Sequence, residues 1–557
     1  MQVAWRALRR KLPAFIKGAV RRQADTLLPN REAGLYREWM ARRLAERGRL
    51  YPDGIAPGLV SIITAVWDGS PIRYLQTLAD SIVKQNPEGA CEWVLLDNGC
   101  SNRILRGYLD RLRCYPWIKV HRLEQNTGIA SGLRHCLEHA ANRYIAPVDA
   151  DDYLYPDALR VLSAWIQRTG FPAALYSDED KIVGTRFYQP YLKPDWDPVL
   201  LANSAYTAHL GVVERELALR LGAYGDPATE GSPDWDLFMR VMLDGQCAVH
   251  IPEVLYSWRV HAHSTADDAA TKPYVEASQK AVLQRFLDAR SLTEKFDIER
   301  NSLLGGAAHW HFSRREDFAA PVTTVAVRAG EPGDARELLP LAREAAAQGG
   351  WIHFLGEDVT IEDTGWMCEA RGLFELHPGT VMVGGRIHNR QGIVMEAGRC
   401  FGYGGVCGCP NRGRSMLDPG YFTEMWKQRS VSAVSTQFAV IDAAFLADLL
   451  GSIPRVPVVL LGAWAGAQAL RRGKRVVYSP FLSGVSDLDW EPLFDASEQT
   501  LFAETNRDLI PDRRFYSRCL SLEKPFAFAA EIEPPPGGFT PPASDQADRP
   551  RAESPEL

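Results

Sequence analysis

Acidic residues occur at three places in the first half of the chain where they could do chemistry. Val148-Asp-Ala-Asp-Asp-Tyr153 follows a short apolar run. Carboxylates two residues apart after a buried strand can converge on one hard cation, and Mg²⁺ or Mn²⁺ held there would bind substrate phosphates and stabilise a diphosphate leaving group. An isolated Asp-x-Asp is also common in acidic turns, and Asp152 or Asp157 would serve equally well as an N-cap of the next helix.

The two other acidic sites lie on either side of this motif. Asp97 ends an earlier apolar run, where a carboxylate can accept hydrogen bonds from a base or a ribose. The segment Glu230-Gly-Ser-Pro-Asp-Trp-Asp-Leu-Phe-Met-Arg240 places Asp234 and Asp236 at the start of an amphipathic helix. A carboxylate there could act as a general base on an acceptor hydroxyl. Alternatively, both acids stabilise the helix N-terminus and pair with Arg240.

Basic and imidazole groups follow in Tyr256-Ser-Trp-Arg-Val-His-Ala-His-Ser-Thr265. Arg259 could bind phosphate, and either His261 or His263 could complete a metal site. A lone histidine is more often structural. Arg259, His261 and His263 therefore indicate a functional site only in combination with the acidic residues that precede them in the chain. Asn126-Thr-Gly128 lies before the helix that leads to the Asp-x-Asp motif.

The elements that must position these residues alternate in type. Apolar, β-rich runs predict strands over 59–66, 92–97, 118–123 and 144–149, and helical spacing predicts helices over 72–84, 103–112 and 128–141. This alternation predicts an α/β fold with a mostly parallel sheet and helices on both faces. Ligands bind at the carboxyl ends of such strands, and Asp97 and Asp149 both fall there.

The sequence also contains a weak internal repeat. Residues 233–252 align without gaps on 461–480, and 144–151 align on 351–358. We therefore predict a duplicated domain whose second copy has diverged. In that copy Gly356 replaces Asp149 and Asp358 is retained opposite Asp151. Gly462, Trp464 and Gln468 replace Asp234, Asp236 and Arg240. Our hypothesis is that the second copy does not catalyse transfer and binds acceptor glycan or a partner.

Taken in order, the motifs between Val60 and Thr265 resemble family 2 of the glycosyltransferases, with its GT-A fold. Ser61-Ile-Ile-Thr-Ala-Val-Trp67 is similar to the opening strand, and Glu92-Trp-Val-Leu-Leu-Asp-Asn-Gly to the second strand. Asp149-Ala-Asp151-Asp152 resembles the metal-binding motif, and Arg259-Val-His261 resembles the Arg-x-His that closes the site. The sequence departs from the family pattern at Ala65 and Trp67, which replace Pro and Tyr, and at Pro233.

The resemblance implies a role for each of these positions. Asp234 corresponds to the catalytic base, and Asp149, Asp151 and His261 correspond to the ligands of Mn²⁺ or Mg²⁺. The residues expected to contact the nucleotide sugar donor are Thr64, Trp67, Asp97, Asn126, Asp149 and Arg259.

The resemblance also implies a function. Tyr176-Ser-Asp-Glu-Asp180 and Lys193-Pro-Asp-Trp-Asp197 are similar to members, often rhamnosyltransferases, that build bacterial surface polysaccharides such as O-antigen. It implies inverting transfer to a glycan or lipid-linked glycan acceptor. Asp178 and Asp180 are expected to line the acceptor side.

The net charge and the local sequence patterns indicate which partners are expected and how the chain is divided into domains. The 557 residues carry a net charge of −6, which does not indicate nucleic acid as a partner. We predict a basic helical N-terminal segment, a catalytic GT-A domain, a linker, a degenerate GT-A-like domain and a disordered Pro-rich tail. Their ranges are 1–55, 56–290, 291–320, 321–530 and 531–557.

The N-terminal segment is the one strongly charged part of the chain. Residues 1–50 carry thirteen Lys and Arg against four Asp and Glu, and Val3–Lys17 mixes this charge with Trp, Leu, Phe and Ile. Such a segment can lie on an anionic membrane surface, and equally it can form a solvated helix that packs on the next domain. Because no apolar run reaches the ~18–20 residues that span a bilayer, we expect a cytoplasmic protein, with peripheral contact at the inner membrane as the open alternative.

Two rival functions belong to other classes. A catalytically inactive carbohydrate-binding scaffold would share the fold, but the intact acids of the first copy argue against it. A sugar-phosphate nucleotidyltransferase needs a Gly-rich basic loop after the first strand. The corresponding segment, Ala65-Val-Trp-Asp-Gly-Ser70, has one glycine and no basic residue.

Overall fold

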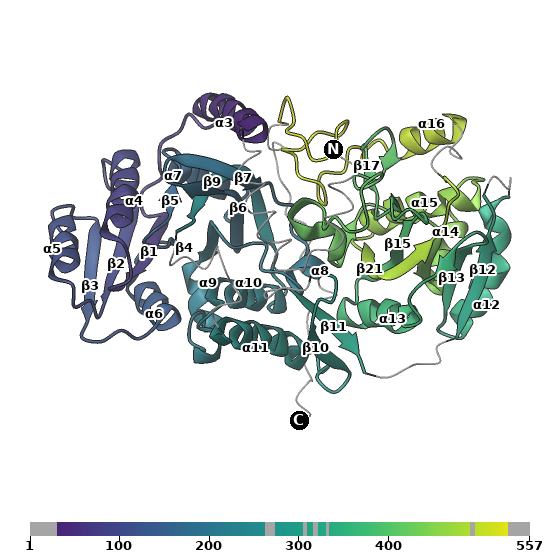
Figure 1. Cartoon of the computed structure of the whole chain (residues 1–557), viewed down its shortest axis with the longest axis horizontal. Helices are drawn as coiled ribbons and strands as arrows, with labels where there is room; N and C mark the ends of the chain where they lie inside the picture. Colours follow the sequence, from purple (N-terminus) through teal and green to yellow (C-terminus); the bar gives the residue numbers. More distant parts are fainter. Residues whose placement is uncertain are drawn as a thin grey trace, which may run out of the picture.

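The chain forms two sheets that lie at opposite ends of the molecule, each flanked by helices (Figure 1). The computed structural model describes residues 30–261, 273–304, 309–315, 321–329, 333–490 and 496–532. A β-hairpin of β10 (Phe296–Arg300) and β11 (Trp310–Arg314) lies between the two units, within the segment predicted to be a linker.

The first sheet has nine strands in the order β3-β2-β1-β4-β8-β6-β9-β5, with β7 paired to β6. Its first four strands are parallel, which confirms the predicted α/β fold, and antiparallel pairs attach β8, β7 and β5. The bounds are β1 (Val60–Val66), β2 (Glu92–Asn98), β3 (Ile118–Leu123), β4 (Tyr144–Pro147), β5 (Tyr153–Leu154), β6 (Ala174–Val183), β7 (Arg186–Tyr191), β8 (Gly211–Glu214) and β9 (Ala248–Arg259).

Helices cover both faces of this sheet because its central strands are apolar on both sides. Ile62 of β1 packs in one core with Leu78 and Leu105, whereas the next residue, Ile63, packs in a second core with Leu133 and Phe238. The helices are α4 (Ile72–Gln85), α5 (Arg103–Leu112), α6 (Ile129–His139), α7 (Ala158–Arg168), α8 (Pro198–Leu201), α9 (Arg215–Arg220), α10 (Pro233–Leu243) and α11 (Pro273–Ala289).

The second sheet repeats part of the first. Its order, β12-β13-β20-β15-β21-β14, matches β1-β4-β8-β6-β9-β5, and every neighbouring pair runs in the same relative sense. Counterparts of β2 and β3 are absent from the second sheet among the described residues. The strands on this path are β12 (Val322–Val327), β13 (Trp351–Gly356), β14 (Thr360–Ile361), β15 (Thr380–His388), β20 (Phe438–Asp442) and β21 (Arg475–Val485).

The remaining elements of the second unit complete the likeness. α15 follows β20 and precedes β21, as α10 follows β8 and precedes β9, in agreement with the predicted alignment of 233–252 on 461–480. The remaining bounds are β16 (Val394–Glu396), β17 (Cys400–Phe401), β18 (Cys407–Gly408), β19 (Arg429–Val431), α12 (Leu339–Ala347), α13 (Trp366–Leu376), α14 (Ala443–Leu450), α15 (Leu461–Arg471) and α16 (Ala496–Thr505).

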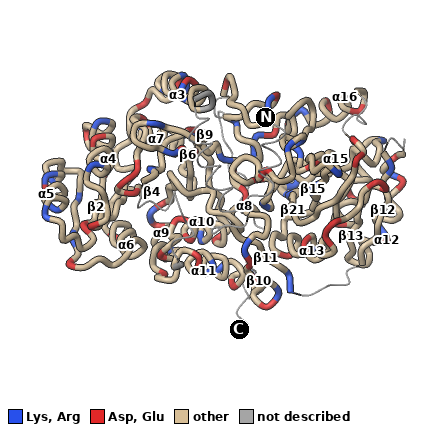
Figure 2. Tube along the Cα trace, viewed as in Figure 1, with Lys and Arg blue, Asp and Glu red and all other residues tan. Residues whose placement is uncertain are grey.

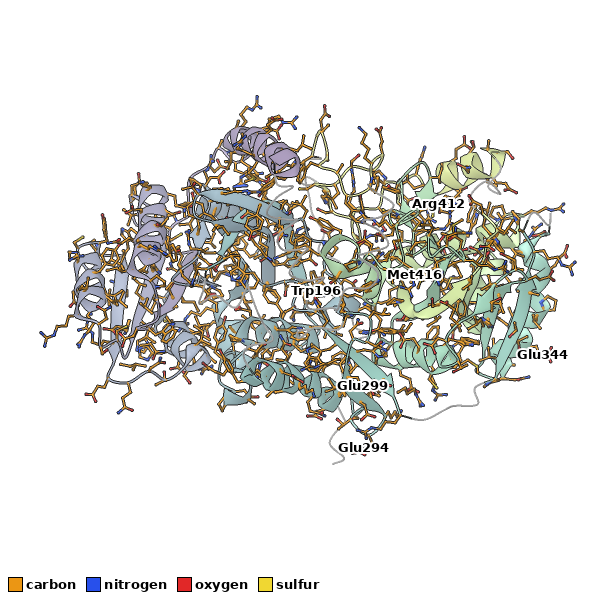
Figure 3. The ribbon with its side chains drawn as sticks, viewed as in Figure 1. Trp196, Glu294, Glu299, Glu344, Arg412 and Met416 are labelled. Carbon is orange, nitrogen blue, oxygen red and sulfur yellow. The ribbon has the colours of Figure 1, made fainter. Side chains whose placement is uncertain are left out.

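Buried polar contacts join the two units. The carboxylate of Asp197 accepts hydrogen bonds from the backbone N–H of Ser430 at 2.8 Å and from its hydroxyl at 2.7 Å. The hydroxyl of Tyr421 accepts from the N–H of Leu192 at 2.9 Å. Figure 3 shows side chains filling the space between the two sheets, with Trp196 labelled near the middle. The first unit is therefore held against the second through specific hydrogen bonds.

The described part of the basic segment packs on the first unit. In α3 (Asn30–Leu50), buried Arg43 and Arg47 donate to the carboxylates of Glu253 and Asp157, with Nε–O distances of 2.9 and 3.0 Å. The stretch Val3–Lys17 lies outside the described residues, so membrane contact stays a prediction. No described helix combines the length and the apolar character that crossing a membrane requires.

Candidate functional site

Two chain segments meet where β4 and β9 end. Asp149 and Asp151 follow β4, where Figure 2 shows an acidic stretch, and Arg259 and His261 lie at the end of β9. The Nε2 atom of His261 is 2.7 Å from a carboxylate oxygen of Asp151, and the Nε–H of Arg259 donates to the Asp151 carbonyl at 2.6 Å. The structure therefore brings together two of the three predicted metal ligands.

The third predicted ligand, Asp149, lies among acidic groups. Its side chain keeps access to solvent, yet it is crowded by protein atoms. Burial raises the pKa of Asp149 to about 8, and the nearby charges of Asp151 and Asp234 add to the effect. Carboxylates that raise one another's pKa in this way favour either a shared proton or a bound cation. The residues present therefore fit a divalent ion.

The two acids at the start of α10 have separate roles. Buried Asp236 pairs with the Nε atoms of Arg240 at 2.6 Å and Arg285 at 2.9 Å. The carboxylate of Asp234 has no such hydrogen bond or ion pair within the described part of the chain, and burial raises its pKa to about 6. Asp236 therefore forms an ion pair with Arg240, as one of the two interpretations of the sequence expected. The carboxylate of Asp234 remains available to accept a proton.

Asp152 connects the two segments of this site, a role that the sequence did not indicate. The carboxylate of Asp152 accepts from the N–H of Arg259 at 2.7 Å and from the hydroxyl of Tyr256. Ligand atoms of Asp149, Asp152 and His209 lie within 4.8 Å of one another. Burial, with a contribution from Lys193, lowers the pKa of His209 to about 3, so this imidazole is neutral. No motif marks His209 in the sequence.

Both carboxylate oxygens of Asp152 are already occupied, which distinguishes it from Asp149. A ligand atom that already accepts a hydrogen bond from a buried donor has less capacity for a cation. Asp152 therefore ties the turn after β4 to the end of β9 and keeps Asp151, Arg259 and His261 in place.

The predicted donor side is built around β2. Fully buried Asp97 pairs with Arg122 of β3, with Nε–Oδ2 at 2.5 Å, and accepts from the N–H of Cys100 at 2.9 Å. The neighbouring Asn98, which sequence reasoning missed, donates to the carbonyl of Gly128 at 2.8 Å. Asn126 accepts from the N–H of Gly128 at 2.9 Å. Asp97, near the end of β2, and Asn126, in the turn after β3, thus both lie at the carboxyl edge of the sheet.

The two predicted donor contacts in and after β1 differ. Trp67 is 54% exposed and follows the strand directly. Thr64 is fully buried, and its hydroxyl accepts a hydrogen bond from the indole of Trp93 at 3.1 Å. Its side chain belongs to the core because it points to a covered face of the sheet. We expected Thr64 to contact the donor, but its side chain is buried and already hydrogen-bonded to Trp93.

Glu230 links the two sides of the site. Its carboxylate accepts from the N–H of Ile129 and, at 3.0 Å, from the N–H of Ala130, which are the first residues of α6. A carboxylate satisfies the free N–H groups of a helix N-terminus and interacts favourably with the helix dipole. The loop before α10 is therefore fixed to the turn that carries Asn126.

The expectation that Asp178 and Asp180 line the acceptor side is wrong. Both are fully buried, because β6 lies inside the sheet between β8 and β9. Asp178 accepts from the N–H of Lys193 at 2.7 Å and lies 2.8 Å from Nε2 of His250. Asp180 accepts from the hydroxyl of Tyr36 at 2.6 Å. These acids stabilise the fold.

Side chains added at the equivalent positions of the second unit would be crowded, tightly at Gly356 and severely at Gly462. A Cβ atom on Gly356, the counterpart of Asp149, would lie 3.0 Å from the ring of Trp490. A Cβ atom on Gly462, the counterpart of Asp234, would overlap the carbonyl oxygen of Val434. Close packing of α15 on this backbone therefore requires glycine there.

Comparisons with known proteins place similarity to glycosyltransferases in the first unit. Residues 61–212 match the family model described as glycosyl transferase family 2. The chain is 26% identical over 481 residues to the uncharacterized protein y4gI of Sinorhizobium fredii, which covers 75% of this chain and 51% of that protein. It is 28% identical over 256 residues to the O-antigen biosynthesis protein RfbC of Myxococcus xanthus, which covers 43% of this chain and 20% of that protein.

Among solved structures, Staphylococcus aureus TarS 1–349 in complex with UDP-GlcNAc matches with a TM-score of 0.36 and 17% identity. The match covers 42% of this chain and 70% of TarS 1–349.

Proposed function

Because residues 61–212 match the family model described as glycosyl transferase family 2, we propose that the protein transfers a sugar from a nucleoside diphosphate donor to a hydroxyl of a glycan or lipid-linked glycan. The observation that carries the proposal is the meeting of Asp149, Asp151, Asp234 and His261 at the ends of β4 and β9 and the start of α10. The likeness to RfbC supports a role in polysaccharide biosynthesis.

Asp151 and His261, with Asp149 directly or through water, would hold Mn²⁺ or Mg²⁺. The ion, when bound, would neutralise charge that develops on the diphosphate leaving group. Arg259 supports the same side of the reaction, because its Nη2 atom is buried and has no hydrogen-bond partner within the described residues. A phosphate oxygen would satisfy that donor.

Asp234 would act as the single base. It takes the proton of the acceptor hydroxyl while the hydroxyl oxygen bonds to the anomeric carbon. The bond from that carbon to the diphosphate oxygen breaks, and its electron pair leaves with the phosphate. One displacement from the opposite face inverts the anomeric configuration. Asp97, Asn126 and exposed Trp67 would position the nucleotide.

The second unit would not catalyse transfer. We assign residues 56–290 to the catalytic domain and residues 321–530 to a domain that binds acceptor glycan or a partner. Its lack of catalysis is supported by the glycines that replace two acids, since an added Cβ would be tightly packed at Gly356 and would overlap the backbone at Gly462. Peripheral contact with the cytoplasmic face of the inner membrane through the basic N-terminal segment, residues 1–55, is part of the same proposal.

The test is a donor screen on the purified full chain. Release of nucleoside diphosphate is measured from UDP-, GDP- and dTDP-sugars with Mn²⁺ or with EDTA, beside an Asp234→Asn variant, first alone and then with glycan or lipid-linked acceptors. We expect metal-dependent release from one donor and its loss in the variant. If no donor is consumed while glycan still binds, the protein is an inactive carbohydrate-binding scaffold.

A further inference from the structure

Three histidines gather at the outer edge of the first unit, apart from the site described above. His121 lies on β3, and His135 and His139 lie four residues apart on α6, so that the two helical side chains share one face. One ring nitrogen from each lies within 4.8 Å of the other two. The centroid of the His139 ring lies 4.2 Å from that of the His135 ring and 4.4 Å from that of the His121 ring. Figure 1 shows β3 and α6 at the end of the molecule away from the second sheet.

The hydrogen bonds leave these rings able to bind a metal ion. The Nδ1 atom of His139 is 2.8 Å from the backbone carbonyl oxygen of His135. A carbonyl oxygen only accepts, so Nδ1 carries the proton and the lone pair of a neutral His139 is on Nε2. Metal-bound histidines usually donate their other N–H to such a group, which fixes the ring orientation.

His135 supplies an independent observation. Its Nε2 atom is buried and has no hydrogen-bond partner among the described residues. A buried polar atom without a partner is unfavourable and is rare in folded proteins. Burial and neighbouring imidazoles also lower the pKa of His135 and of His121, which favours the neutral, ligating form of both rings.

We propose that His121, His135 and His139 form a second metal site, which binds a borderline transition-metal ion such as Zn²⁺. Three imidazole nitrogens suit Zn²⁺, whereas Mg²⁺ and Mn²⁺ prefer the oxygen ligands of the site at Asp151. The two sites therefore differ in chemistry as well as in place. This proposal does not depend on the proposed transferase activity.

The ion would fasten the edge strand to the helix. His121 precedes Arg122, which pairs with Asp97, and α6 begins at the turn that carries Asn126. Because β3 has a neighbour on one side only, a metal bridge to α6 adds a constraint that the sheet alone does not supply. The bridge would hold the two segments that flank the donor side and raise the thermal stability of the first unit.

The experiment uses the full chain without a histidine tag, stripped with EDTA and titrated with Zn²⁺ in competition with a chromophoric chelator. The chain is compared with His121→Gln, with His139→Gln, and with a matched Asp151→Asn/His261→Gln double variant that leaves the three histidines intact. The wild-type chain and the double variant should each bind one Zn²⁺ that both single histidine variants bind at least about tenfold more weakly.

Two further readouts separate ligation from packing. Co²⁺ bound by the three histidines should give visible absorption bands in the wild-type chain and the double variant but not in His139→Gln. Exposed His139 can be replaced without opening the core, and metal-free thermal unfolding checks that the variant is folded. Equal Zn²⁺ binding by the wild-type chain and a folded His139→Gln chain would overturn the proposal. So would Zn²⁺ binding that is lost only in the Asp151→Asn/His261→Gln variant.

Discussion

The imidazole Nε2 of His261 and a carboxylate oxygen of Asp151 lie 2.7 Å apart, although 110 residues separate them in the chain. The contact joins the end of β9 to the turn after β4, and Asp152 fixes the same two segments through the N–H of Arg259. Hydrogen bonds within the protein therefore bring together residues that we assign to the divalent metal.

Replacing His261 by Gln should raise the Mn²⁺ concentration needed for half-maximal donor turnover by about tenfold or more. The substitution removes a nitrogen ligand beside Asp151. The variant His209→Gln serves as the comparison and should have the smaller effect, because His209 is not among the proposed ligands and lies beside Asp149 and Asp152. Titration of activity with Mn²⁺ measures both, and a larger loss for the His209 variant would show that the other cluster binds the ion.

Asp234→Asn should lower kcat by about 10²–10⁴-fold, since the amide cannot take the acceptor proton. Donor binding should be retained. Asp236→Asn is the matched control: it removes buried ion pairs with Arg240 and Arg285 and should destabilise the protein by about 2–3 kcal/mol. Kinetics and thermal unfolding separate the two effects. Full activity in a folded Asp234→Asn chain would remove Asp234 as the base.

At saturating Mn²⁺ the rate of transfer should fall as the solution becomes acidic, with the midpoint of the fall at or below pH 6. Burial raises the pKa of Asp234 to about 6, and a base works only in its deprotonated form, so activity is lost as pH falls through that value. A bound dication shifts the limb toward lower pH by favouring the carboxylate. A pH–kcat profile checks this, and a rate that does not change between pH 4 and 7 would contradict it.

Glu230→Ala should destabilise the protein by about 1–2 kcal/mol, because two N–H groups at the start of α6 lose their acceptor. Glu138→Ala on the exposed side of the same helix is the control and should cost less than about 0.5 kcal/mol, since it removes only a surface pair with Arg134. Chemical denaturation of both variants measures the difference, and equal losses would argue against the capping role.

Asp358→Asn should leave donor turnover unchanged. Asp358 is the second-unit counterpart of Asp151, but its carboxylate accepts from the hydroxyl of Ser486 and the space beside it at Gly356 is filled by Trp490. Steady-state kinetics with the identified donor is the measurement. A strong loss of turnover in a folded variant would mean that the second unit takes part in the reaction.

The sequence alone determined the parallel strands of the first sheet and the ends at which its acids lie. Both faces are mostly apolar in the strands Val60–Val66 and Glu92–Asn98, and this pattern predicts that helices cover the sheet on both sides. The ends of the apolar runs predict that Asp97 and Asp149 lie at the carboxyl edge of the sheet. The repeat was also readable, because the corresponding strands occur in the same order along the chain in both units.

Only the tertiary structure decided which polar residues reach the site. Thr64, Asp178 and Asp180 carry the same side-chain types as the residues around the site, yet all three are buried in the core. Asp152, His209 and Glu230 act on groups up to 107 residues away. The sequence pattern predicts which face of a strand is buried and where the strand ends. Which partner forms a hydrogen bond with a buried polar group depends on packing between segments that are distant in the chain.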